Sequence, residues 1–262
     1  INQPTVATTR QPVGIGKDCI FLDLERPELW QIPPFVESAV LCAAITDISY
    51  CRENPDQAKK INLDNILLLA RELNNRGVFV TFLSTNLVFD GTISNTSPTA
   101  HMNPQTIYGN LKAETEIQLA DLFEDIAIIR LTKVFYSGIN IINDWEKRLN
   151  LNKVIRPFSD YRCAPIDLQT TVKGIAQITL NHLPGIWQFS PECDVGYSDI
   201  ALEVAYRNKA DMALVKPVVS STEATLEHVP KHTTLDASRS HSELDLNFKD
   251  MPTILDGILG LA

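Results

Sequence analysis

Short apolar segments alternate with helix-patterned segments along the first half of the chain, and this alternation constrains the fold more than any other feature. The runs at 38–46, 78–85 and 126–132 are rich in Val, Ile, Leu, Phe and Ala. Such runs are typical of parallel strands covered on both faces. Between them, apolar residues at 55–76 recur at helical spacing, and Gly77 is placed to end that helix. Strands that alternate with helices predict an α/β fold with a parallel sheet.

Two shorter segments precede these runs, and a looser region follows them. Residues 5–9 are β-branched and suggest a strand, and residues 19–24 indicate a buried strand. A helix over 109–124 completes the regular part. After residue 135 the alternation weakens, although 165–183 still favours a helix and 185–190 a strand.

The composition narrows the range of partners and sites. The net charge is −9 and no basic stripe is present, so we expect neither nucleic acid nor a membrane as a partner. The absence of a signal peptide and of an 18-residue apolar run favours a cytoplasmic protein. The five cysteines are odd in number and include no C-x-x-C pair, which argues against a disulfide framework or a zinc knuckle. No His, Asp and Glu cluster has ligand spacing, so we predict no protein-held metal.

Tyr108 and Lys112 stand four residues apart in a helix-patterned segment, and residues at this spacing share one face of a helix. A nearby ammonium favours the phenolate and lowers the pKa of a phenol, so this pair is suited to proton transfer. On spacing alone, a surface Tyr and a solvated Lys would be the more ordinary interpretation. Upstream, Ser84 and Thr85 fall where a buried strand meets its loop, the end at which open α/β sheets bind ligands. A hydroxyl there could hydrogen-bond a substrate carbonyl that Tyr108 protonates.

Three segments together carry a resemblance to a known family: STNLVFDG at 84–91, NPQTIYGNLKAETE at 103–116 and IIRLTKVF at 128–135. The sequence resembles the extended short-chain dehydrogenase/reductases, and within them the dTDP-4-dehydrorhamnose reductase branch. The resemblance implies a Rossmann-like, doubly wound parallel sheet over 1–135. Over 136–262 it implies mainly a smaller substrate-binding lobe, with some segments returning to the first domain. The implied reaction is the NADP- or NAD-dependent reduction of a nucleotide-sugar 4-ketone, and a homodimer is one option.

The resemblance also assigns roles to single residues. Tyr108 corresponds to the proton donor, and Lys112 to the residue that lowers the Tyr pKa and binds the nicotinamide ribose. Thr85, with Ser84 as its substitute, corresponds to the hydroxyl of the triad, and Asn86 lies where the sugar is expected. The other positions that match cofactor contacts are Asp23, Leu24, Ala43, Ala44 and Thr132.

Arg10 ends the first expected strand, at a point that faces the adenosine ribose in this fold. An Arg there can accommodate a 2′-phosphate, which favours NADP over NAD, although a solvated loop Arg is an equal interpretation.

The main departure from the family is the missing Gly-rich turn that cradles the pyrophosphate. No G-x-x-G-x-x-G occurs, and VGIGKDC at 13–19 precedes a strand instead of opening a helix, so we reject it as that turn. We therefore expect the first strand–helix unit to be missing from this sequence, through truncation or through true loss. The first residue, Ile1, favours truncation.

Three alternatives to the reductase stay open at this stage. One is a nucleotide-sugar epimerase or dehydratase that uses the same triad. Another is a non-catalytic NADP-binding regulatory subunit, because the regulatory subunit of methionine adenosyltransferase resembles the same branch. The last is an inactive remnant of the fold.

Overall fold

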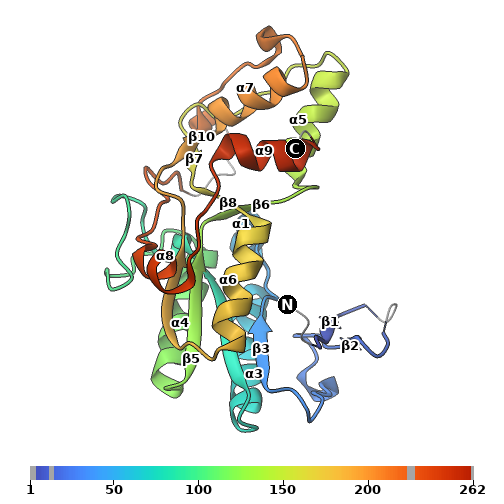
Figure 1. The fold of residues 1–262 in the computed structure, drawn as a ribbon, viewed down its shortest axis with the longest axis vertical. Coiled ribbons are helices and arrows are strands. Elements are labelled where there is room, and N and C mark those ends of the chain that lie inside the picture. The colour runs from blue at the N-terminus through green and yellow to red at the C-terminus, as the bar shows by residue number, and fades with distance from the viewer. Residues whose placement is uncertain (1–3, 12–14, 223–227, 261–262) are drawn as a thin grey trace.

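A four-stranded parallel sheet forms the centre of the computed structural model, which describes residues 4–11, 15–222 and 228–260 (Figure 1). The strand order is β3-β4-β5-β9, and every neighbouring pair runs parallel. The members are β3 (Ser38–Leu41), β4 (Phe79–Thr85), β5 (Ile126–Leu131) and β9 (Gly185–Phe189). Nearly all side chains of β4 and β5 are buried, as their apolar runs predict. The arrangement confirms the predicted Rossmann-like α/β fold.

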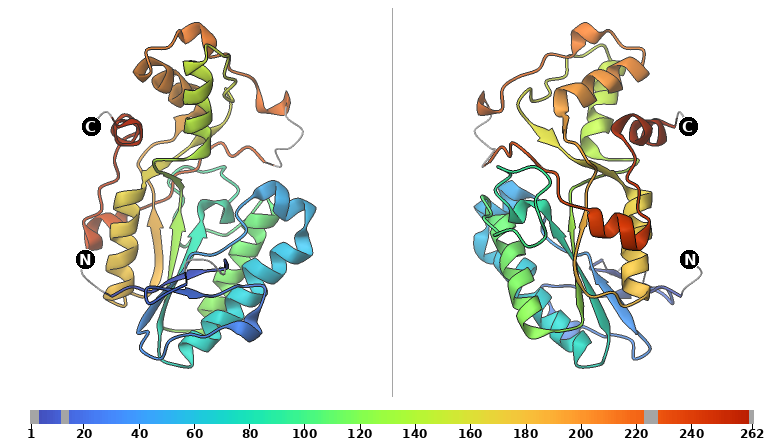
Figure 2. Two further views of the ribbon diagram at one scale, coloured as in Figure 1. Left: turned by 90° about the vertical axis from the view of Figure 1, so that its right-hand side faces the viewer. Right: turned by 60° about the vertical axis from the view of Figure 1, so that its left-hand side comes forward.

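Helices cover both faces of this sheet (Figure 2). On one face lie α3 (Asn65–Asn74) and α4 (Ile107–Leu122), and on the other lies α6 (Leu168–Leu180). The side chain of Thr106 accepts the N–H of Gly109 at 3.0 Å and so caps the start of α4. This cap fixes the residue at which the helix that carries Tyr108 begins.

The helix predicted over 55–76 is present but interrupted. It consists of α2 (Pro55–Lys59), one π-helical turn (Lys60–Asp64) and α3, and Gly77 follows its end with a φ of 74°. The π turn presents Asn62 to the loop after β3, where its carboxamide accepts the N–H of Ile45 and donates to the Ile45 carbonyl, both at 2.8 Å. Because π turns occur mostly at functional sites, this irregularity points to that loop.

The N-terminal segment departs from the sequence prediction. β1 (Ala7–Thr9) and β2 (Cys19–Phe21) pair in parallel with each other and form a separate two-stranded sheet. Their side chains are exposed or half-buried. The prediction of a buried strand over 19–24 is therefore wrong about burial, although a strand is present. Among the described residues β3 has a strand partner only in β4, and it ends at Leu41, short of the predicted 46. In the described part of the chain β3 is thus an edge strand, and three of its four residues are half-buried.

The second half of the chain builds a smaller lobe above the sheet. Its core includes Ile142, Trp145, Ile200, Val204 and Leu255. Its elements are α5 (Asn140–Asn150), β7 (Arg162–Cys163), β10 (Val195–Gly196), α7 (Tyr197–Arg207) and α9 (Met251–Leu259). The parallel pair β6 (Lys133–Phe135) and β8 (Pro165–Asp167) connects this lobe to the sheet. The predicted division at 135/136 stays a prediction. β9 is a member of the four-stranded sheet, and α6 packs against it.

Shorter helices complete the fold. They are η1 (Pro27–Leu29), α1 (Ile48–Glu53), η3 (Asn86–Val88), η4 (Met212–Leu214), η5 (Ser220–Thr222) and α8 (Ser238–Leu244). Within the described part of the chain, no helix has the length and apolarity needed to cross a membrane.

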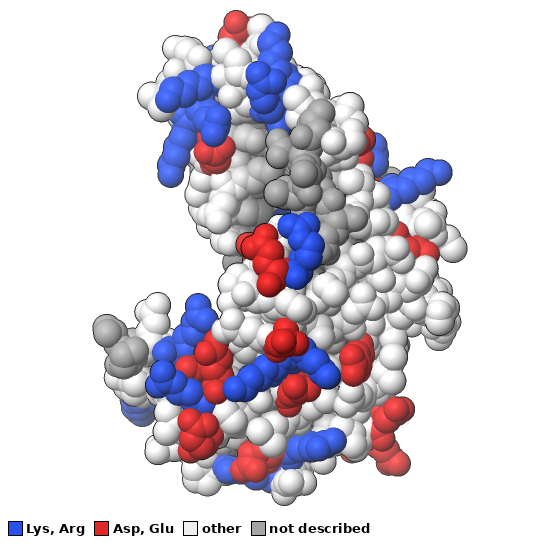
Figure 3. Space-filling view, turned by 180° about the vertical axis from the view of Figure 1, so that it is seen from behind, with Lys and Arg blue, Asp and Glu red and all other residues white. Residues whose placement is uncertain are grey.

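The surface is hollowed on one side, between the smaller lobe and the N-terminal segment (Figure 3). On the face shown, Lys and Arg side chains gather over the upper lobe, whereas both signs of charge are interspersed lower down. Positive charge is therefore available locally on a chain whose net charge is −9.

Candidate active site

Tyr108, Lys112 and Glu116 recur at intervals of four along α4 and face the sheet together. Their exposed fractions are 8%, 3% and 2%. The surface interpretation of the Tyr–Lys pair is therefore excluded, because both side chains lie in the interior. They meet the carboxyl end of β4, the edge at which sheets of this class bind ligands.

Lys112 is held by a backbone carbonyl and by aromatic rings. Its Nζ donates to the Leu83 carbonyl at 2.8 Å and lies 4.4 Å from the ring centre of Phe82. Burial lowers the pKa of Lys112 to about 8, although nearby Glu116 and Cys42 act in the opposite direction. The amine is therefore still mainly charged at neutral pH but close to titration.

Tyr108 has a pKa that differs in direction from the sequence expectation. Burial raises the pKa of Tyr108 to about 12, and the neighbouring Cys51 acts in the same direction. The Lys112 Nζ lies 6.0 Å from the centre of the Tyr108 ring and is engaged by Leu83. Loss of hydration of the phenolate therefore outweighs its attraction to the ammonium, and the expected lowering is not found in this structure.

Gly109 allows α4 to approach the end of β4 closely. A Cβ added at this position would stand 2.3 Å from the Leu87 carbonyl oxygen and 3.1 Å from Thr106 Oγ1. Only a residue without a side chain fits beside the Leu87 carbonyl. The preceding residue, Tyr108, is thereby set beside the turn that follows Thr85.

The two predicted hydroxyls have different partners. Thr85 Oγ1 accepts the N–H of Leu87 at 3.2 Å and lies 3.4 Å from Asn86 Oδ1. Ser84 Oγ instead donates to Glu116 Oε1, in the interior. Asn86 is half-buried and lines a small cavity of about 10 Å³ beneath residues 230–235. Of the two hydroxyls, that of Thr85 is thus the one near Asn86, the residue expected to lie beside the sugar.

The small residues after β3 lie on the same side as Lys112. Ala43 is exposed and Ala44 is half-buried, and both belong to the loop that Asn62 holds through Ile45. The preceding residue, Cys42, is close enough to Lys112 for each group to shift the pKa of the other. Backbone in this loop is therefore open to a ligand that reaches Lys112.

The remaining predicted cofactor residues are placed less directly. Thr132 is buried, and its Oγ1 donates to the Phe189 carbonyl at 3.3 Å. Leu24 packs in the core, and Asp23 is held in a turn, with its Oδ2 3.7 Å from Arg26 Nε. Arg10 is exposed at the end of β1. These last three belong to the N-terminal segment, outside the four-stranded sheet.

The residues of the candidate site fit the nicotinamide end of a dinucleotide cofactor, but none of them fits its pyrophosphate. The nicotinamide end has Lys112, Tyr108 and the accessible Ala43–Ala44 backbone. For the pyrophosphate end, Gly16 supplies no close approach, because a Cβ added there would meet nothing within 4 Å. Gly14 lies outside the described residues. The rejection of VGIGKDC as a phosphate-binding turn is consistent with this open surrounding of Gly16.

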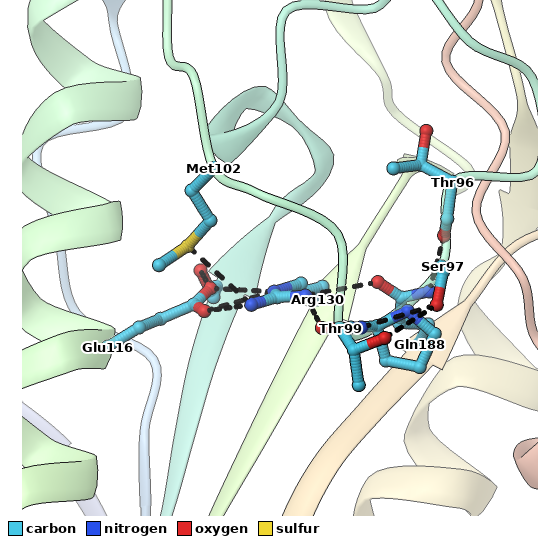
Figure 4. A network of polar contacts seen from close by, with 9 residues as sticks. Thr96, Ser97, Thr99, Met102, Glu116, Arg130 and Gln188 are labelled. Atoms are coloured by element: carbon cyan, nitrogen blue, oxygen red, sulfur yellow. Dashed lines mark hydrogen bonds and ion pairs between the residues drawn. The ribbon is translucent and has the colours of Figure 1, made fainter.

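A buried polar network lies directly behind the site, and sequence reasoning missed it as a unit. It joins Glu116 of α4 to Arg130 of β5 and Gln188 of β9 (Figure 4). The spacing of Glu116 from Lys112 was a signal that could have located one end of it. Gln188 carries no such signal, because its role arises only from strand pairing.

A larger groove lies away from these residues, between α6 and α9. Its volume is about 450 Å³, and its apolar lining includes Phe135, Val172, Ile254 and Ile258. None of the predicted site residues lines it. Among the described residues, no group of three or more His, Cys, Asp or Glu side chains could hold a metal ion.

Comparison with known proteins shows the family of this chain and the fold that it shares with solved structures. A family model described as the RmlD substrate binding domain matches residues 33–257. A dTDP-4-keto-6-deoxy-D-glucose reductase of Streptomyces niveus is 25% identical over 241 residues, which are 90% of this chain and 81% of that protein. Methionine adenosyltransferase 2 subunit beta of Bos taurus is 24% identical over 214 residues, 76% of this chain and 63% of that protein.

Among solved structures, the dTDP-4-dehydrorhamnose reductase of Bacillus anthracis in complex with NADP superposes with a TM-score of 0.79. The sequence identity is 18%, and the match covers 86% of this chain and 81% of that one. At this identity the likeness shows a shared fold.

Proposed function

The chain belongs to the RmlD substrate binding domain family, and from that premise we propose that it is an oxidoreductase that reduces the 4-keto group of a nucleotide sugar with NADPH or NADH. One observation carries the proposal: Tyr108 and Lys112 lie together on the buried face of α4, next to the turn that follows Thr85 and at the carboxyl ends of parallel strands. The similarity to a dTDP-4-keto-6-deoxy-D-glucose reductase supports the substrate class.

In this proposal the chain's own residues manage the proton. Tyr108, with a pKa raised to about 12 by burial, is protonated at neutral pH and can donate to a ketone oxygen. The phenolate left behind needs a nearby positive charge, which the Lys112 ammonium provides from the same helix face. Thr85 and Asn86 orient the sugar from the end of β4.

The nicotinamide cofactor would supply the hydride when bound. Lys112, Thr132 and the Ala43–Ala44 backbone would hold its nicotinamide end. Arg10, Asp23 and Leu24 are the candidates for its adenosine end. We assign no residue to the pyrophosphate, because the sequence contains no Gly-rich turn for it. A cytoplasmic location and a homodimer stay predictions of the sequence.

The substitution Tyr108→Phe tests the proton donor. With dTDP-4-keto-6-deoxy-glucose as the probe and loss of nicotinamide absorbance as the signal, kcat should fall by about 100-fold or more. The matched control is Tyr206→Phe, because Tyr206 is 72% exposed and remote from α4; its kcat should equal that of the unmodified protein. Wild-type turnover by the Tyr108→Phe variant would contradict the assignment. Analysis of the product separates reduction from epimerisation or dehydration.

A regulatory subunit is the second candidate function. The similarity to methionine adenosyltransferase 2 subunit beta favours it. Under this alternative the protein would be isolated in stoichiometric complex with an enzyme and would reduce no keto sugar. The combination of Tyr108, Lys112 and Thr85 in one place favours the reductase, because a purely regulatory surface has no need of a buried proton donor.

A further inference from the structure

The loop that joins β4 to α4 is long and packs against α4 beside Ala113. This β4–α4 loop (residues 89–106) contains no helix or strand and connects the Thr85 turn to Tyr108. Loops longer than about 12–15 residues without secondary structure are usually functional or disordered. Backbone hydrogen bonds to residues 232–236 hold part of this loop, such as the one from the Thr96 N–H to the Thr234 carbonyl at 3.2 Å, and side chains hold the part that follows.

Three polar side chains stand in register across the sheet beneath this loop. Ser84 of β4 pairs with Arg130 of β5, which pairs with Gln188 of β9. Residues directly opposite one another in a sheet point to the same face, and here that face is covered by α4. All three are at least nine-tenths buried, and Arg130 is 2% exposed. A charge buried this deeply is expensive unless it is fully paired.

On the α4 side, the Arg130 guanidinium is paired with Glu116. Arg130 Nε donates to Glu116 Oε1 at 3.2 Å and to Oε2 at 3.0 Å, and Nη2 donates to Oε2 at 2.7 Å. Ser84 Oγ also donates to Oε1. These bonds fix the plane of the guanidinium, and they tie it to the helix face that carries Tyr108 and Lys112.

On the other side, the same network reaches the β4–α4 loop at three points (Figure 4). Arg130 Nη1 donates to the Pro98 carbonyl at 2.9 Å and to Gln188 Oε1 at 3.3 Å, and Nη2 lies 3.6 Å from Met102 Sδ. Gln188 Nε2 donates to the carbonyl of Thr96 at 2.9 Å and to that of Asp236 at 3.0 Å. One planar guanidinium thus spans helix, sheet and loop.

We propose that Arg130 is a positioning residue of the candidate active site, which together with Glu116 and Gln188 fixes the β4–α4 loop relative to Tyr108. The inference rests on the proposed function only in treating the loop as a wall of a reductase site. Arginine is required because its planar fork donates to several fixed acceptors at once, which a lysine ammonium cannot reproduce in this geometry. A buried ion pair adds little stability compared with apolar packing, so its retention here fits a role in geometry.

Two variants separate positioning from general stability. Gln188→Met removes the bonds to Thr96 and Asp236 without touching α4, and Arg130→Lys keeps the charge beside Glu116 but loses the fork. The matched control is Thr81→Val, which removes a buried hydrogen bond of 2.8 Å to Thr179 on the opposite, α6-covered face of the same sheet. If Arg130→Lys does not fold, Gln188→Met carries the test alone.

Amide hydrogen exchange of the free protein, followed by mass spectrometry, reads the loop directly. We expect residues 92–105 to exchange about tenfold faster in both variants, with α6 unchanged, and to exchange at the unmodified rate in Thr81→Val. The positioning role would be overturned if the loop exchanged at the unmodified rate in both variants. It would also be overturned if the exchange rate of the loop rose equally in Thr81→Val.

A kinetic measurement extends the test to catalysis. With dTDP-4-keto-6-deoxy-glucose, KM should rise about tenfold in Gln188→Met while kcat changes less than about threefold, because the proton donor itself stays in place. Equal losses in Gln188→Met and Thr81→Val would contradict the inference. If the unmodified protein reduces no keto sugar but the loop still responds in exchange, the proposed function fails and the positioning role stands.

Discussion

Replacing Lys112 by Met should change how the stability of the protein depends on pH. The Lys112 ammonium is 3% exposed, and burial lowers its pKa from the ordinary 10.5 to about 8. Met has a similar length and no charge, so the variant keeps the packing against Phe82 and removes the titration. The quantity to compare is the difference in free energy of unfolding between the unmodified protein and Lys112→Met.

The sign follows from the protons bound in each state. Between about pH 8 and 10.5 the unfolded chain holds the Lys112 proton, whereas the folded protein has released it. Stability then rises with pH, by up to about 1.4 kcal/mol for each pH unit and about 3 kcal/mol over the window. Below pH 8 both states are protonated, so the difference is constant and the unmodified protein carries the full cost of the buried charge.

Urea unfolding at one-unit intervals from about pH 7 to 10 measures this difference. Tyr108 acts with the opposite sign, because its raised pKa removes stability as pH rises from about 10 to 12, but it is present in both proteins and largely cancels. The control is Lys173→Met, which changes an exposed lysine of α6. A difference that stays flat between pH 8 and 10 for Lys112→Met would refute the buried, strained state of this amine.

Two further substitutions test how the site is supported. Gly109→Ala should lower the free energy of unfolding by about 3 kcal/mol, because the new Cβ would stand 2.3 Å from the Leu87 carbonyl oxygen. The control is Gly257→Ala in α9, where a Cβ meets nothing within 4 Å, so this variant should be neutral or slightly stabilising. Equal effects of the two substitutions on stability would contradict the steric argument. Asn62→Ala should cost about 2 kcal/mol in thermal or urea unfolding, because it leaves the N–H and carbonyl of Ile45 without their buried partner; an unchanged stability would show that the loop after β3 is held otherwise.

The central strands and the α4 face could be predicted from sequence because both depend on short-range patterns. The apolar runs of β4 and β5 leave no polar face, so each must be covered on both sides. The four-residue spacing of Tyr108 and Lys112 places both on one side of any helix. Which side faces inward did not follow from that spacing; the structure shows that both side chains are buried.

The features that could not be predicted depend on contacts between distant segments. Residues 19–24 are as apolar as a buried strand, but the structure gives β2 only β1 as a partner, so the pattern misleads about burial. The direction of the Tyr108 pKa depends on burial of the phenol by segments distant in sequence, and the spacing from Lys112 does not show that burial. Gln188 enters the network only because β9 returns beside β5.

The residues at the two ends of the proposed cofactor site are consequently packed into the fold to different extents. Lys112, Tyr108 and Thr132 are buried and belong to α4 or the strand ends of the four-stranded sheet, so the end at which the proton moves is held rigidly before any ligand arrives. Arg10 and Asp23 belong to the separate β1–β2 segment, whose strands are exposed or half-buried and do not pair with β3. In doubly wound sheets the dinucleotide lies in the crevice outside the carboxyl ends of the strands. Changes at α4 should therefore act on turnover, whereas changes at Arg10 or Asp23 should act on dinucleotide affinity, because these two are the proposed contacts of its adenosine end.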